Sequence, residues 1–115
     1  MQLIHKDFDG TRLIEVAEER IDAAVAIRFK DQMRALTCDG PERVVLDLSR
    51  VNFLDSSGLG AVVGAMKQVG QGRRLELAGL TPTVQKVFKL TRMDSVFTIH
   101  PDAQTALGGG LADAS

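Results

Sequence analysis

The chain has 115 residues, a length that suits one domain with a single core and requires neither a disulfide nor a metal for stability. Hydrophobic residues make up 44% and charged residues 25%, which is typical of a folded globular protein and excludes a disordered chain. The formal net charge is −1, from 14 basic and 15 acidic residues, so no overall field attracts the chain to nucleic acid or to an anionic membrane.

The cysteine count and the first residues indicate the cellular compartment. Cys38 is the single cysteine, so it has no partner for an internal disulfide. The opening sequence MQLIHKDFDG lacks the apolar core of a signal peptide, and no run approaches the roughly 20 apolar residues that span a bilayer. We therefore expect a cytoplasmic protein without a membrane segment.

The N-terminal part predicts a hairpin followed by a helix. Two apolar-rich runs, residues 1–6 and 11–17, are separated by a segment ending in Asp9-Gly10, which favours a tight hairpin turn. Asp22 is placed to be the N-cap of a helix that ends before the turn signal at residues 38–41. Apolar residues with helical spacing mark the buried face of this helix: Val25, Phe29, Met33 and Leu36.

The middle of the chain alternates strands and helices. Residues 43–48 are a near-continuous apolar run, which predicts a strand covered on both faces in the middle of the sheet. A second helix is opened by Ser57-Gly58 and closed by Gly70, and residues 74–78 predict another strand. Thr81-Pro82 then offers an N-cap hydroxyl and a proline at the first position of a third helix.

The C-terminal part predicts a last strand over residues 95–99 and a short helix over 101–107, followed by a frayed tail at 108–115. Such alternation builds a mainly parallel sheet with helices packed on it. We therefore expect an α/β fold with one domain over residues 1–107. An N-terminal β-hairpin joins a mainly parallel mixed sheet that carries about four helices.

A serine pair lies where a buried strand passes into a helix. Residues 51–60 place Ser56 and Ser57 near the helix start, where free amides favour negative charge, so a serine there is suited to carry a phosphate. The other interpretation is that Asp55, Ser56 or Ser57 simply caps the helix. Spacing alone favours this second interpretation.

The stretch VVLDLSRVNFLDSSGLG, residues 44–60, resembles the signature of the STAS family, named for sulfate transporters and anti-sigma antagonists. Residues 75–88 and 90–97 resemble further family segments, so the resemblance covers almost the whole chain. The pair Ile21-Asp22 is kept, whereas Glu19 and Val25 stand where family members often have glycine and threonine.

The resemblance implies a stand-alone bacterial anti-sigma factor antagonist. In its unphosphorylated form such a protein binds an anti-sigma factor with a serine kinase ATPase domain and so releases a sigma factor for transcription. A serine phosphatase reverses the modification. The resemblance assigns phosphorylation to Ser56, with Ser57 as the second choice. The expected partner-binding residues are Asp22, Asp55, Ser56, Ser57, Gly58 and Leu59.

Two other functions keep the same fold or the same serine. The chain could be a STAS subunit of a lipid-transport complex, or of a stress or chemotaxis-like signalling complex with a different partner. A serine hydrolase is the weaker alternative, because Leu54 and Asp55 stand where G-x-S-x-G requires the first glycine. His5 and His100 also lie in no recognisable catalytic motif, so we expect no enzyme activity.

We expect neither a cofactor nor a metal. Cys38 and the histidines show no ligand spacing, and Gly64 falls one residue late for a dinucleotide loop that begins at Gly58 and Gly60. Close packing of the helix on the sheet is the simpler explanation of these glycines. The basic residues Lys86, Lys89 and Arg92 are interpreted as a solvated helix face, with docking as a weaker alternative. A monomer or a weak homodimer is expected.

Overall fold

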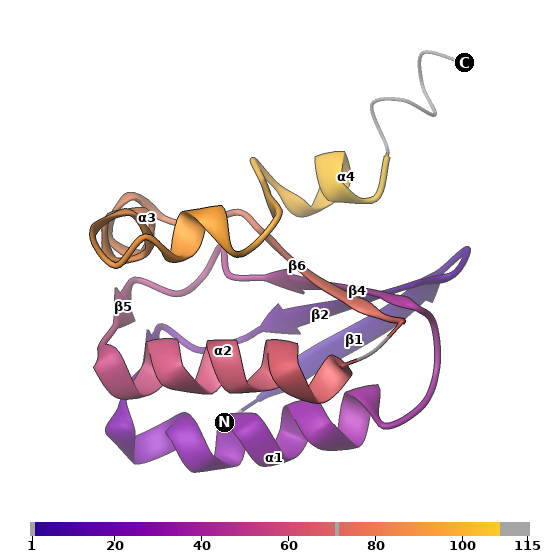
Figure 1. Cartoon of the computed structure of the whole chain (residues 1–115), viewed down its shortest axis with the longest axis horizontal. Coiled ribbons are helices and arrows are strands. Elements are labelled where there is room, and N and C mark those ends of the chain that lie inside the picture. Colours follow the sequence, from indigo (N-terminus) through magenta and orange to yellow (C-terminus); the bar gives the residue numbers. More distant parts are fainter. Residues whose placement is uncertain (1, 71, 109–115) are drawn as a thin grey trace.

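Figure 1 shows the computed structural model, which describes residues 2–70 and 72–108. A five-stranded sheet has the order β1-β2-β4-β6-β7; β1 is antiparallel to β2 and the other neighbours are parallel. Its strands are β1 (Leu3–Phe8), β2 (Thr11–Val16), β4 (Arg43–Asp47), β6 (Arg74–Ala78) and β7 (Ile99–His100). The separate two-stranded sheet consists of β3 (Arg20–Ile21) and β5 (Phe53–Leu54).

The helices cover both faces of the larger sheet. They are α1 (Ala23–Thr37), α2 (Ser56–Val69), α3 (Pro82–Leu90), the 3-10 helix η1 (Met93–Ser95) and α4 (Ala103–Ala106). In Figure 1, α1 and α2 lie side by side below the sheet, and α4 lies above it. The predicted α/β fold with a hairpin, a mainly parallel sheet and four helices is therefore confirmed.

The main core lies between the sheet and the pair α1 and α2. Alternate residues of β2, β4 and β6 point into it, as the period of a strand requires. Its fully buried members include Ile14, Val44, Leu46, Leu77, Phe29, Met33 and Val62. Each such side chain contributes about 1.5–3 kcal/mol by leaving water. A smaller cluster on the opposite face joins Val45 and Ala78 to Ala106 of α4.

Local signals placed the hairpin and the central strand correctly. Asp9 and Gly10 have φ angles of 37° and 81°, and a type I′ turn requires positive φ at both central residues. The strand predicted in the middle of the sheet is β4, which pairs in parallel with β2 and β6. Asp22 caps α1, and the helix ends at Thr37, one residue before the predicted stop signal.

The strand predicted over residues 95–99 is wrong. The chain forms η1 there and returns to the sheet only at Ile99–His100. Arg92 adopts the left-handed conformation with φ 61°, and its carbonyl accepts a hydrogen bond from the Ser95 hydroxyl at 2.8 Å. Phe97 is buried edge-on against Phe88, with ring centres 5.8 Å apart. The apolar residues of this segment are thus buried without a strand.

Two finer predictions also need correction. The second helix begins at Ser56 rather than at Ser57-Gly58, because Asp55 is its N-cap. Thr81 occupies the N-cap position of α3, but its hydroxyl donates to the carbonyl of Val51 at 2.7 Å and does not cap the helix. The short C-terminal helix is confirmed as α4. The predicted tail lies, beyond residue 108, outside the described residues.

Candidate functional site

The N-termini of α1 and α2 meet at two aspartates. The Asp22 carboxylate accepts a hydrogen bond from the Ala24 amide at 3.1 Å, and the Asp55 carboxylate accepts one from the Gly58 amide at 2.8 Å. The second oxygen of Asp55 reaches across to the Ala23 amide of α1 at 3.3 Å. A single carboxylate therefore joins both helix starts.

The small sheet sets this arrangement. Arg20 pairs with Phe53, and the amides of Asn52 and Phe53 both donate to the carbonyl of Glu19, at 2.7 and 3.1 Å. Each strand of this sheet leads directly into its helix, so the pairing brings the two helix starts into register. The departure from the family pattern at Glu19 does not disturb this turn, because only its main-chain carbonyl is used.

Gly58 is the point at which α2 approaches β3 most closely. A Cβ atom added at Gly58 would lie 1.9 Å from the Ile21 carbonyl oxygen, well inside the 3.0 Å that Cβ contacts essentially never cross. Gly60 has no atom within 4 Å of such a Cβ, and Gly64 meets only the flexible side chain of Lys30 at 3.4 Å. Close packing therefore explains Gly58, whereas the same explanation for Gly60 and Gly64 is wrong.

Both candidate phosphorylation sites are exposed. Ser56 and Ser57 are the first two residues of α2. Among the described residues, neither hydroxyl takes part in a hydrogen bond, and the capping role belongs to Asp55. Of the other predicted partner-binding residues, Asp22 and Asp55 are half-buried at the surface, Gly58 is buried, and Leu59 packs partly against the core.

The two helix N-termini offset only part of the negative charge of the aspartates before any modification. Each helix N-terminus carries about +0.5 charge, so the two together offset roughly half of the −2 charge of Asp22 and Asp55. A phosphate at Ser56 adds about −1.5 to −2 charges in the next position along the chain. Because the Asp55 carboxylate already accepts from free amides, we expect the phosphate to gain little from the helix dipole.

Arg20 and Phe53 complete the surface beside the helix starts. The guanidinium of Arg20 lies over the Phe53 ring, 4.1 Å from its centre, and its Nε lies 3.3 Å from the Asp22 carboxylate. The sequence did not predict that Arg20 and Phe53 are in contact. The resemblance did include Phe53 within its signature stretch, but 32 residues separate it from Arg20, and their contact depends on the pairing of two-residue strands.

A charged cluster lies on the other face of the sheet, beneath α4. Glu76 is nearly buried and accepts from Arg43 Nη2 at 2.6 Å and from His100 Nε2 at 2.8 Å. Burial raises the pKa of Glu76, but the hydrogen bonds from Arg43 and His100 outweigh this, so its pKa lies below the ordinary value. Arg43 also donates to the Ala106 carbonyl at 2.5 Å and so holds α4 to the sheet.

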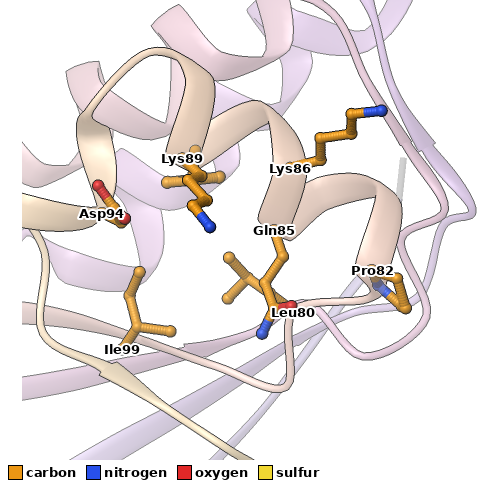
Figure 2. A pocket seen from close by; sticks show the side chains of 8 residues that line it. Leu80, Pro82, Gln85, Lys86, Lys89, Asp94 and Ile99 are labelled. Atoms are coloured by element: carbon orange, nitrogen blue, oxygen red, sulfur yellow. The ribbon is translucent and has the colours of Figure 1, made fainter.

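A hollow of about 480 Å³ lies between α3, η1 and the start of β7. Figure 2 shows Lys89 extending toward the opening, with Asp94 beside it and Ile99 below, whereas Lys86 points away. Both lysines and Arg92 are exposed. Within the described ranges there is no helix long and apolar enough to cross a membrane, and no cluster of three side chains suited to a metal ion.

The molecule is a small α/β domain with an exposed hydroxyl pair where two helix starts converge, and an open hollow of about 500 Å³ lies beside them at Arg20 and Asp22. This exposed surface suits a binding domain. A family model described as the STAS domain matches residues 4–106. The chain therefore belongs to the STAS domain family.

Relatives of similar length carry a common name. The chain is 32% identical over 107 residues to the putative anti-sigma factor antagonist BtrV of Bordetella bronchiseptica, covering 92% of this chain and 91% of that one. It also resembles the crystal structure of an anti-sigma factor antagonist from Mycobacterium paratuberculosis, with TM-score 0.83, 27% identity, and 94% and 92% of the chains covered.

The fold is shared more distantly with the Bacillus cell fate determinant SpoIIAA in its phosphorylated form. The TM-score is 0.65 at 20% identity, with 92% of this chain and 96% of that one covered. This likeness shows the fold alone. The relatives named as anti-sigma factor antagonists are regulatory binding proteins rather than known enzymes.

Proposed function

We propose that this chain is an anti-sigma factor antagonist, a cytoplasmic protein whose binding is switched off by phosphorylation of Ser56. In the unphosphorylated form it binds an anti-sigma factor that carries a serine kinase ATPase domain, and thereby releases a sigma factor. A serine phosphatase restores the binding form. The similarity to BtrV over 92% of this chain supports the assignment as an anti-sigma factor antagonist, because BtrV is named as a putative one.

The observation that carries the switch is the exposure of Ser56 beside an aspartate that already caps the helix. Because Asp55 satisfies the Gly58 amide, the Ser56 hydroxyl is not needed to hold the helix start together. A kinase can therefore modify it while the fold stays intact. The phosphorylated form of SpoIIAA, which has the same fold, supports the view that this architecture tolerates the modification.

The expected size of the switch follows from Coulomb's law. Two like unit charges about 5 Å apart, at an effective dielectric constant near 20, repel by about 3 kcal/mol. That energy corresponds to roughly a hundredfold loss of affinity. Within the domain the phosphate points into water, where screening weakens its repulsion from Asp55, so we expect the cost to stability to stay below about 1 kcal/mol.

The test combines a binding titration with a thermal melt. Each purified anti-sigma factor of the source organism is titrated with the wild-type chain and with Ser56→Asp and Ser56→Ala. We expect Ser56→Asp to weaken binding about a hundredfold and to melt within about 3 °C of wild type. Ser56→Ala binds and takes up no label from the kinase.

Different outcomes point to different corrections. Undiminished label uptake by Ser56→Ala moves the site to Ser57. Unchanged affinity of Ser56→Asp refutes the switch. Binding to a transporter ATPase or to another signalling protein, with no binding to any anti-sigma factor, replaces this function with that of a STAS subunit of a different complex.

A further inference from the structure

Arg20 and Phe53 form a stacked pair directly before the two helix starts. The guanidinium carbon lies 4.1 Å from the centre of the phenyl ring, well inside the range of about 6 Å for a cation–π contact. The Nε group is fixed a second time by the Asp22 carboxylate, 3.3 Å away. These two contacts orient the guanidinium before any partner arrives.

The pair remains open to solvent. The Arg20 side chain is 61% exposed and Phe53 is 37% exposed. Among the described residues, the two terminal Nη groups of Arg20 make no hydrogen bond, since its one side-chain hydrogen bond goes through Nε. An exposed cation–π contact contributes only about 0.5–1 kcal/mol to folding. Arginine and aromatic side chains are, however, the residues most enriched where protein interfaces gain their affinity.

The charged side chains around the helix starts differ in whether they can still bind a partner. The Asp22 and Asp55 carboxylates are already engaged by main-chain amides of α1 and α2. In the part of the chain that the structure describes, Arg20 hydrogen-bonds only through its Nε, so its two Nη groups can form a forked ion pair. Such a fork matches the two oxygens of a carboxylate in both distance and direction.

We infer that Arg20 and Phe53 select the partner. The anti-sigma factor presents a carboxylate to the Nη groups of Arg20, flanked by an apolar side chain that covers the Phe53 ring. This inference rests on the proposed function, because that function places the partner over the Ser56 end of the molecule. The pair is a specificity determinant, separate from the hydroxyl that is modified.

The experiment measures affinity for the anti-sigma factor that binds the wild-type chain. Loss of a hydrogen-bonded ion pair predicts that Arg20→Gln weakens binding about 10- to 100-fold. Arg20→Lys keeps the charge but loses the planar fork, so we expect a loss of at least about fivefold. Lys6→Gln removes one positive charge from the exposed edge strand β1 and is the matched control, expected to bind within about twofold of wild type.

Thermal melts of the same variants separate binding from folding. We expect all three to melt close to wild type, since Arg20 and Lys6 are both exposed. If Arg20→Gln melts at a lower temperature than wild type, the affinity of Arg20→Lys is the test of the inference, because this variant keeps a cation beside Asp22. If both Arg20 variants bind as tightly as wild type while Ser56→Asp does not, the inference is overturned and the proposed function stands. If no anti-sigma factor binds the wild-type chain, the proposed function fails, and the inference with it.

Discussion

Replacing Asp55 with alanine tests whether one carboxylate really joins the two helices. The substitution removes the cap on the Gly58 amide, which is worth about 1 kcal/mol. It also removes the longer hydrogen bond to the Ala23 amide, worth about 0.5–1 kcal/mol at a surface position. We therefore expect Asp55→Ala to lower the free energy of unfolding by about 2 kcal/mol.

Two matched variants divide this loss. Asp55→Asn keeps an oxygen for the Gly58 amide but offers no acceptor to Ala23, so it should lose about half as much. Asp22→Ala removes the cap of one helix only and should cost about 1 kcal/mol. The measurement is urea unfolding at pH 7, in which a shifted midpoint with an unchanged slope reports stability. An Asp55→Ala variant no less stable than Asp22→Ala would refute the bridging role.

Three further changes follow from the glycines and the buried ion cluster. Gly58→Ala should destabilise the fold by more than about 3 kcal/mol, because the added methyl group meets the Ile21 carbonyl; a folded variant of wild-type stability contradicts this. Gly60→Ala, with open space around it, should instead raise the free energy of unfolding by about 0.5–1 kcal/mol, which urea unfolding measures. Because the folded-state pKa of Glu76 is lowered, its stabilisation is present above the ordinary value of 4.5 and is lost as pH falls through the lower folded value. The free energy of unfolding of Glu76→Gln should therefore fall less steeply than that of wild type as pH drops below 4.5. The same pH dependence in both proteins would contradict a stabilising role for the ion cluster.

Features set by neighbouring residues could be predicted from the sequence. The Asp9-Gly10 turn, the Asp22 cap and the apolar run of β4 each depend on a few consecutive residues, and each was placed correctly. The segment around Phe97 could not be, because an apolar, β-branched run suits a strand as well as a 3-10 turn. Its burial against Phe88 decides the outcome, and that contact is tertiary.

In the candidate site, too, the local features could be predicted from the sequence and the tertiary contacts could not. The resemblance located the Asp55-Ser56 segment, but only the pairing of β3 with β5 brings Asp55 to α1 and Arg20 to Phe53. Strands of two residues leave no periodic signal in a sequence. The open space around Gly60 was equally hidden, since spacing alone cannot tell a glycine required by packing from one that faces solvent.

The hydrogen bond from Arg43 to α4 also affects where the protein can be shortened or tagged for expression. A recombinant chain shortened ahead of Ala103 would lose the acceptor at Ala106 and strip the cover from Val45 and Ala78. The apolar surface exposed in this way lies in the middle of the sheet, so we expect the shortened protein to aggregate and to be poorly soluble. Affinity tags at the C-terminus are therefore best attached beyond Gly108, with the helix left whole.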